Sequence, residues 1–109
     1  MKKLSIIIVT YNSEKDIYEC LDTIYSHCDI PIKELEVIIV DNNSTDCDTM
    51  FNKLKTLWGE DIILIKNSSN GGYGQGNNVG IRQCSAPVVL IMNPDVRLTS
   101  SSFKSVLMQ

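Results

Sequence analysis

Residues 88–95 read V-V-L-I-M-N-P-D, and the rest of the chain is organised around this stretch. The apolar run at 88–92 is typical of a buried strand, and Pro94 ends it because proline lacks an N–H and has a fixed φ. Asp95 therefore follows the carboxyl end of the strand, where we expect a cleft. Because hard divalent cations prefer oxygen ligands, Asp95 is a candidate ligand for Mg²⁺ or Mn²⁺.

Three similar apolar runs precede this one, at 4–9, 35–40 and 62–65. Each is short and rich in β-branched residues, which is typical of strands buried on both faces of a parallel sheet. Helices are predicted at about 14–27, 47–58 and 75–84, with a short one at about 103–107. The alternation predicts an α/β fold in one domain over 1–109, an open, doubly wound, mostly parallel sheet of strand order 3-2-1-4.

Serine, threonine and aspartate precede the first two predicted helices and supply their expected caps. Ser13 with Asp16 forms an S-x-x-D arrangement, and Ser44 or Thr45 is placed to cap the second helix. Helix capping alone would thus explain why polar residues occur at Ser13, Asp16, Ser44 and Thr45. Asp41 precedes the cap and is not needed for it, so it stays available for binding.

Composition excludes several classes of function. The chain has 109 residues, 43% of them hydrophobic and 21% charged, with a net charge of −3 and no basic cluster, so nucleic acid is an unexpected partner.

No apolar run approaches the roughly 20 residues of a membrane span, and the first run is too short for a signal peptide. The four cysteines form no C-x-x-C pair and His27 is the only histidine, which favours reduced thiols in a cytoplasmic protein over a zinc site. Membrane association of a full-length protein is left open.

Polar clusters follow all four predicted strands. They are Thr10-Tyr11-Asn12, Asp41-Asn42-Asn43, the stretch 67–76 and Asn93-Pro94-Asp95. Carboxyl ends of parallel strands share one edge, and ligands bind there at the point where the strand order reverses. Each cluster has a purely structural interpretation as a turn or a cap, but four on one edge indicate a ligand site.

The chemistry of these clusters suits a nucleotide diphosphate. Tyr11 offers a face for stacking a base, and Asp41 can accept from a ring N–H, which uracil and thymine have and cytosine lacks. Four of the six glycines lie at 67–78, more than turns require, which indicates backbone that approaches a ribose or phosphates closely. A cation on Asp95 would bridge the diphosphate and stabilise its charge as it leaves.

Four motifs together resemble family 2 glycosyltransferases of the GT-A fold. They are S-I-I-I-V-T-Y-N (5–12), V-I-I-V-D-N-N-S-T-D (37–46), N-G-G-Y-G-Q-G-N-N-V-G-I (70–81) and V-L-I-M-N-P-D-V (89–96). The resemblance covers nearly the whole chain. The N-P-D form is most similar to the rhamnosyltransferase-like branch, which uses dTDP- or UDP-sugars to build bacterial surface polysaccharides.

The resemblance implies an inverting enzyme that transfers a sugar from a UDP- or dTDP-sugar to a polysaccharide or lipid-linked acceptor. Thr10 and Tyr11 would line the nucleoside pocket, and Asp41 would read the pyrimidine N3–H. The full expected nucleotide-binding set is Thr10, Tyr11, Asn12, Asp41, Asn43, Asn70, Gly71 and Asn77. Asp95 would be the metal ligand, as the last carboxylate of the family's D-x-D motif. Asn93 stands at the first position of that motif, which weakens the expected metal site.

The family's catalytic domain continues beyond its D-x-D motif into the acceptor site, where the catalytic base lies. We therefore expect a truncated, donor-binding part of the domain, with its catalytic base beyond Gln109. Such a piece would bind nucleotide without transferring sugar. Its fourth strand would be a free apolar edge, which favours self-association.

Two other classes of protein compete with this interpretation. A Rossmann-type dinucleotide-binding domain needs its G-x-G-x-x-G after the first strand, where this chain has T-Y-N-S-E-K. A receiver-type signalling module needs acidic residues after the first strand and an aspartate after the third, and neither is present. A P-loop is excluded because the chain has no G-x-x-x-x-G-K-[ST] motif.

Overall fold

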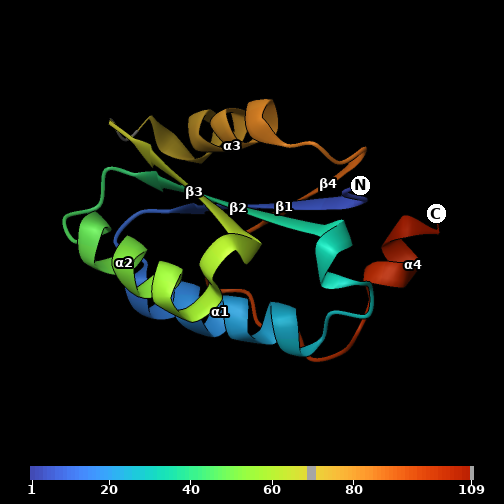
Figure 1. Ribbon diagram of the computed structural model, residues 1–109. Coiled ribbons are helices and arrows are strands. Elements are labelled where there is room, and N and C mark those ends of the chain that lie inside the picture. Colours follow the sequence, from blue (N-terminus) through green and yellow to red (C-terminus); the bar gives the residue numbers. More distant parts are fainter. Residues whose placement is uncertain (69–70, 109) are drawn as a thin grey trace.

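The computed structural model describes residues 1–68 and 71–108, the side chain of Tyr73 excepted. Strands and helices alternate as predicted (Figure 1). The elements are β1 (Leu4–Thr10), α1 (Glu14–Ser26), β2 (Leu35–Asn42), α2 (Cys47–Trp58), β3 (Ile62–Asn67), α3 (Gly72–Gln83), β4 (Val88–Met92) and α4 (Phe103–Leu107). Single 3-10 turns, η1 (Ile32–Glu34) and η2 (Gly59–Asp61), lead into β2 and β3.

The sheet has four parallel strands in the order β3-β2-β1-β4, which confirms the predicted topology. In this register Thr10 lies opposite Asp41, and Ile8 lies opposite Met92. Helices α1 and α2 cover one face of the sheet and α3 covers the other (Figure 1). The carboxyl ends of the strands therefore meet at one edge, with the polar clusters beyond them.

The two central strands are buried along their whole length, which explains why their sequences are continuous apolar runs. On the α1 and α2 face, side chains such as Ile6, Ile8 and Leu21 form the larger core cluster. On the α3 face the core is smaller and is built on Ile7, Val9, Ile38 and Val40.

Helix α3 begins at Gly72, three residues before the predicted start at Gln75, and contains most of the glycine-rich stretch. A Cβ at Gly76 would lie 2.8 Å from Val9 Cγ1, and one at Gly80 would lie 2.5 Å from Ile7 Cγ2. The backbone of α3 thus rests directly on β1. This corrects part of the sequence interpretation, because Gly76 allows the close approach of a strand and need not serve a ligand.

The predicted helix caps are wrong at the side-chain level. Ser13 stands at the start of α1, but its hydroxyl binds the backbone of Tyr11 and caps no helical N–H. Asp46, and neither Ser44 nor Thr45, stands at the start of α2, again without a side-chain cap. Ser44 is instead turned toward Asp41, because a buried carboxylate there needs its donors.

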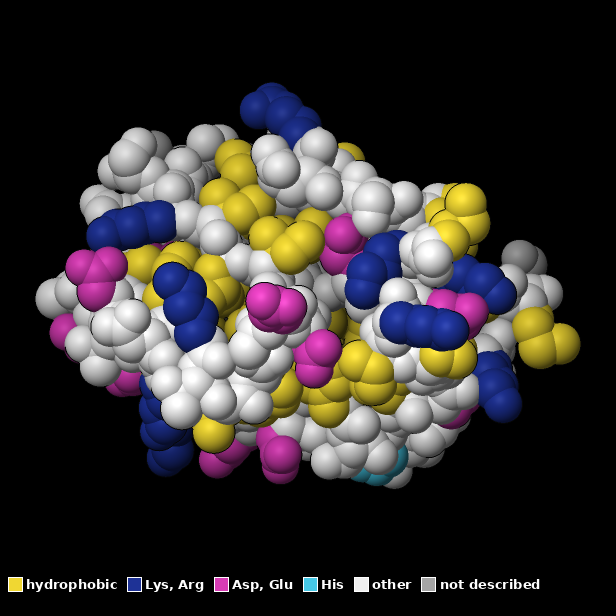
Figure 2. All heavy atoms as spheres, viewed as in Figure 1, with side chains coloured by type: hydrophobic (Ala, Val, Ile, Leu, Met, Phe, Trp, Pro, Cys, Tyr) yellow, Lys and Arg dark blue, Asp and Glu magenta, His cyan; other side chains and the backbone are white. Residues whose placement is uncertain are grey.

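After β4 the chain runs back along α1 toward the amino end of the sheet, where α4 lies (Figure 1). No helix among the described residues is long and apolar enough to cross a membrane. Figure 2 shows basic and acidic side chains interspersed over the face formed by α2 and β3, without a large area of one sign. This distribution agrees with the absence of a basic cluster in the sequence.

Candidate functional site

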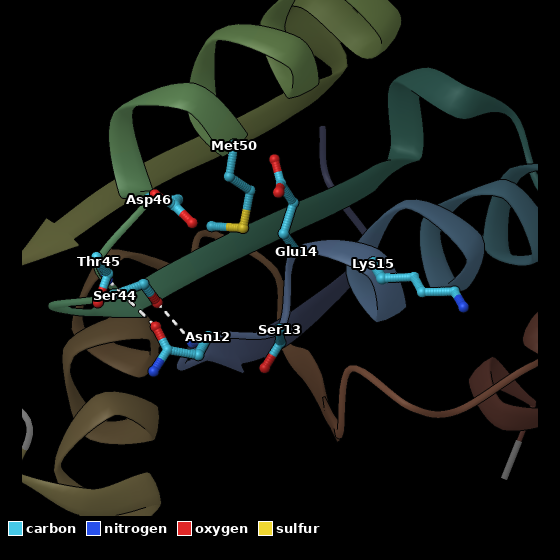
Figure 3. A pocket seen from close by; sticks show the side chains of 8 residues that line it. All are labelled: Asn12, Ser13, Glu14, Lys15, Ser44, Thr45, Asp46 and Met50. Atoms are coloured by element: carbon cyan, nitrogen blue, oxygen red, sulfur yellow. Dashed lines mark hydrogen bonds between the residues drawn. The ribbon is translucent and has the colours of Figure 1, made fainter.

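Three adjoining hollows follow the carboxyl edge of the sheet. The α2 hollow, of 600 Å³, lies beside residues 43–49 and Lys66. The central hollow, of 370 Å³, lies between residues 12–15 and 44–46, under Met50 (Figure 3). The third hollow, of 350 Å³, is lined by Ser13, Asp16, Asn93, Pro94 and Asp95. We call it the switch hollow because it lies at the point where the strand order switches sides. Each has the size of a small-molecule site, and neighbouring hollows share lining residues.

The switch hollow occupies the position at which ligand binding is expected. It lies between residues that follow β1 and residues that follow β4. In the order β3-β2-β1-β4 the strands β2 and β3 are added on one side of β1 and β4 on the other, so the strand order reverses between β1 and β4. Asp95 is exposed there, as the sequence predicts.

Thr10 and Asp41 are both fully buried and bind each other. The Thr10 hydroxyl donates to Asp41 Oδ1 at 2.7 Å, the Ser44 N–H donates to Oδ2 at 2.8 Å, and the Ser44 hydroxyl donates to Oδ1 at 2.5 Å. The Asp41 carboxylate thus has three donors within the protein, and its part in ligand binding stays a prediction. In this arrangement its carboxylate ties the end of β1 to the turn after β2.

Cys47 begins α2 close to the same carboxylate. Burial, followed by its hydrogen bond to Asp41, raises the pKa of the Cys47 thiol to about 12. The thiol is therefore neutral and unreactive at physiological pH, and it serves as a further partner of Asp41.

Two asparagines turn the chain in the same way after neighbouring strands. Asn12 and Asn43 have φ values of 50° and 65°, in the left-handed region that asparagine tolerates better than most residues. The Asn12 N–H donates to Ser44 Oγ at 2.7 Å, and Asn12 Oδ1 accepts from the Thr45 N–H at 3.2 Å (Figure 3). Both asparagines are exposed, and Tyr11 beside them is 45% exposed.

Ser44 therefore links the two turns, a role different from the helix cap that the sequence predicts. A signal for its role was present, because T-Y-N-S begins at the end of β1 and D-N-N-S begins near the end of β2. The register between β1 and β2 pairs their first residues, Thr10 and Asp41.

The central hollow offers little positive charge from side chains. Glu14 and Met50 extend toward each other across it, whereas Lys15 points away (Figure 3). The first turns of α1 and α2 border it without side-chain caps, so their N–H groups supply partial positive charge. A diphosphate bound here would therefore need a cation to balance most of its charge.

The start of α3 is held against the sheet by amide side chains. Asn42 Nδ2 donates to the carbonyl oxygen of Gly72 at 3.0 Å, and Asn67 Nδ2 donates to Asn42 Oδ1 at 2.8 Å. Gly71 is exposed and Asn77 is half-buried beside this network. Asn70, a predicted nucleotide-binding residue, lies outside the described residues.

Asp95 shares the switch hollow with the oxygen-bearing side chains of Ser13, Asp16 and Asn93. Asn93 and Val96 form a tight turn, in which the Val96 N–H donates to the Asn93 carbonyl oxygen at 3.1 Å, and Asp95 lies at its tip. Within residues 1–68 and 71–108 no three acidic, His or Cys side chains form a metal cluster. A cation would therefore be held by one or two carboxylates and by ligand phosphates, which is usual for Mg²⁺. The donor set fits such an ion.

Tyr11 and Asp95 thus follow β1 and β4, and Asp41 lies at the carboxyl end of β2, on the same edge of the sheet, but the three residues do not line one hollow. Asp95 lines the switch hollow, Asp41 is buried below the turns, and Tyr11 is exposed outside the three hollows. The expected edge is present, and its surface around Tyr11 is open.

The fold and the polar edge define the class of protein. Residues 5–109 match the model of glycosyl transferase family 2, and the chain belongs to that family. The four-stranded parallel sheet of order 3-2-1-4 corresponds to the GT-A fold of solved glycosyltransferases. The glycine-rich segment follows β3 and not β1, so the Rossmann-type alternative finds no support.

Particular relatives include enzymes of cell-wall polymer synthesis. Poly(ribitol-phosphate) β-N-acetylglucosaminyltransferase TarS of Staphylococcus aureus strain Mu50 is 33% identical over 95% of this chain, which covers 18% of TarS. Poly(ribitol-phosphate) β-glucosyltransferase of Bacillus spizizenii is 32% identical over 85% of this chain and 15% of its own length. The chain thus spans less than a fifth of these relatives.

Two solved structures place ligands on the same fold. TarS 1-349 in complex with UDP-GlcNAc has a TM-score of 0.83 and 31% identity, over 97% of this chain and 30% of that one. The mannosyltransferase PcManGT of Pyrobaculum calidifontis, in complex with GDP-Man and Mn²⁺, has a TM-score of 0.82 and 27% identity, over 92% and 29%.

Proposed function

We propose that this chain binds a nucleotide-diphosphate sugar along the carboxyl edge of its sheet, as the donor-binding part of an inverting glycosyltransferase. The observation that carries the proposal is the convergence of the polar turns after β1, β2 and β4 on one edge, at the reversal of strand order. The UDP-GlcNAc complex of TarS supports a UDP- or dTDP-sugar as the donor. The acceptor in this proposal is a polysaccharide or a lipid-linked glycan.

In this proposal exposed residues contact the nucleoside and buried residues hold them in place. Tyr11 stacks on the base, while Asn12 and Asn43 present amide groups beside it. For Asp41 to read a pyrimidine N3–H, the turn at Ser44 would have to move aside, because the carboxylate is fully buried beneath it. Gly71, Asn70 and Asn77 complete the proposed nucleotide surface.

Asp95 would hold Mg²⁺ or Mn²⁺, with Asn93 and Asp16 as neighbouring oxygen donors. When bound, the cation would stabilise negative charge on the leaving diphosphate. The Mn²⁺ in the PcManGT complex supports a divalent cation.

The finer assignments belong to the same proposal. Motif N-P-D at 93–95 supports the rhamnosyltransferase-like branch. Because the chain covers only 30% of the TarS structure, we propose that the catalytic base lies outside it and that this chain alone transfers no sugar. The four free cysteines support a cytoplasmic location, and association of a longer protein with the membrane remains part of the proposal.

Calorimetric titration with UDP, dTDP, GDP and NAD, each with and without Mn²⁺, tests this function. We expect UDP or dTDP to bind more tightly than GDP or NAD, and Mn²⁺ to strengthen binding in the native chain but not in Asp95→Asn. Preferential binding of NAD, or equal binding of all four without an effect of Mn²⁺, contradicts the proposal. Measurable sugar transfer by this chain to an added acceptor contradicts the donor-only role.

A further inference from the structure

Arg97 joins the turn that carries Asp95 to helix α1. Its Nη1 donates to the carbonyl oxygens of Pro94 at 3.1 Å and Val96 at 3.0 Å. Its Nη2 donates to Asp16 Oδ1 at 2.9 Å and Glu19 Oε2 at 2.8 Å. The side chain is only 29% exposed, so the guanidinium fills the space between the turn and the helix.

The segment after β4 contacts one face of α1, and these contacts orient the segment. Residues 16, 19, 20 and 23 have the i, i+3, i+4, i+7 spacing of one helical face. Cys20 Sγ lies 4.0 Å from the carbonyl oxygen of Asn93, and Thr23 Oγ1 accepts from the Leu98 N–H at 3.0 Å. Arg97 lies in the segment after β4 and binds the carbonyl groups on both sides of Asp95 as well as this face of α1.

The charges around Arg97 are compatible with a cation beside Asp95. Asp16 and Glu19 flank the guanidinium, so its positive charge is balanced on the side of α1. Asp16 also lines the switch hollow with Asp95. Arg97 binds Oδ1 of Asp16, so in this proposal the Asp16 carboxylate is shared between the guanidinium and the cation.

We propose that Arg97 is a positioning residue for the donor site: it clamps the turn at 93–96 to α1, so that Asp95 faces the switch hollow. This inference rests on the proposed function, in which Asp95 meets the cation and the diphosphate. Arg97 acts through Asp95 and does not contact the ligand. Its planar, forked guanidinium binds four oxygens at once, an arrangement that the single ammonium group of lysine does not reproduce.

Three variants test the clamp by calorimetry with UDP, with and without Mn²⁺. We expect Arg97→Gln to reduce the Mn²⁺-dependent gain in UDP affinity about tenfold, as substitutions behind a metal ligand do, and to leave binding without Mn²⁺ unchanged. Arg97→Lys should restore part of the gain. Thr23→Ala is the matched control, because it loosens the same segment at Leu98 and should keep the native gain. An unchanged gain in Arg97→Gln, or an equal loss in Thr23→Ala, overturns the proposal.

A second measurement separates this inference from the proposed function. If the native chain binds no nucleotide, the proposed function fails, and the clamp is judged from NMR relaxation of the backbone amides of the metal-free chain. Increased fast motion confined to 93–96 in Arg97→Gln, and absent in Thr23→Ala, supports the clamp. Unchanged order parameters at Asp95 and Val96 overturn it.

Discussion

Asp41 shows how one buried side chain can organise several turns. Its carboxylate is fully buried and accepts hydrogen bonds from the Thr10 hydroxyl and from both the N–H and the hydroxyl of Ser44. A buried charge is tolerated only when such donors surround it. The turns after β1 and β2 therefore depend on this residue for their shape, whatever its part in binding.

Asp41→Asn should destabilise the fold by about 2–3 kcal/mol, because the amide offers one acceptor oxygen where the carboxylate offers two. Urea unfolding, followed by circular dichroism, measures this difference. Thr10→Val, which removes only one of the donors, should cost less, about 1 kcal/mol. A loss below 0.5 kcal/mol in Asp41→Asn, about the size of an ordinary surface substitution, would contradict the role assigned to this carboxylate.

Asn43 gives a second prediction at this scale, based on its φ of 65°. Asn43→Ala should cost about 1 kcal/mol, because a Cβ without a compensating side-chain amide is disfavoured in the left-handed region. Asn43→Gly is the matched control and should be close to neutral, since glycine adopts this conformation freely. Equal unfolding free energies for the two variants would argue against a conformational requirement.

At the scale of elements, α3 packs closely on the sheet because two of its residues, Gly76 and Gly80, have no side chain. Gly76 and Gly80 are one helical turn apart and face Val9 and Ile7. Glycine weakens an isolated helix by about 1 kcal/mol relative to alanine, so close packing on β1 must offset that cost. The result places the glycine-rich start of α3 at the ends of β2 and β3.

Gly80→Ala should therefore destabilise the protein by about 1–3 kcal/mol, because the new Cβ would overlap Ile7 and push α3 outward. Gly74→Ala is the control on the same helix, since a Cβ there meets nothing within 4 Å. It should stabilise the fold by about 0.5–1 kcal/mol. Chemical unfolding of both variants checks the opposite signs, and a stabilised Gly80→Ala would refute the packing argument.

Glu36 at the amino end of β2 predicts a dependence of stability on pH. Burial alone would raise the pKa of Glu36, but hydrogen bonds from the Ser85 N–H and from the Ser5 and Ser85 hydroxyls bring it below its ordinary value of 4.5. A carboxyl group with a lowered folded-state pKa contributes stability that is present above its unfolded pKa and is lost as pH falls through the folded pKa.

Urea midpoints of the native chain and Glu36→Gln should accordingly differ at pH 7 and converge as the pH falls below 4.5. The variant keeps the shape of the side chain and removes its titration. A constant difference between the two across this range would show that the charge of Glu36 contributes nothing.

At the scale of the whole molecule, β4 forms one edge of the sheet and presents apolar side chains on the face that α3 leaves open. Ile91 is 50% exposed and Val89 is 37% exposed, while α3 contacts β1 and β2. An unpaired strand edge beside exposed apolar surface favours pairing with another strand. Self-association through this edge remains a prediction.

Ile91→Lys should shift the chain toward the monomer at high protein concentration, because a charge on an edge strand opposes edge-to-edge pairing. Sedimentation velocity over a range of concentrations measures the effect. Leu57→Lys on α2 is the matched control, since Leu57 is 54% exposed but lies on a helix beside α1 and not on an edge strand, and it should leave the distribution unchanged. A native chain that is monomeric at every concentration would contradict the prediction.

The local sequence alone was sufficient for the strands, the helices and their order. Apolar, β-branched runs such as 35–40 and 88–92 predict strands from their composition alone, and the parallel topology follows from their alternation with helices. The placement of Asp95 after β4 and of the other polar turns on the same edge follows from that topology. Tests of their binding roles remain to be made.

Side-chain partners far apart in sequence were decided only by the tertiary structure. The Thr10 hydroxyl donates to Asp41 across 31 positions, Gly76 packs on Val9 of β1, and Arg97 donates to Glu19 of α1 across 78 positions. Hydrophobic periodicity and secondary-structure propensity report interactions between residues that are close in sequence. Which buried acceptor needs a donor, and which helix lies close enough to supply one, depends on how the layers pack, and that information is distributed over the whole chain.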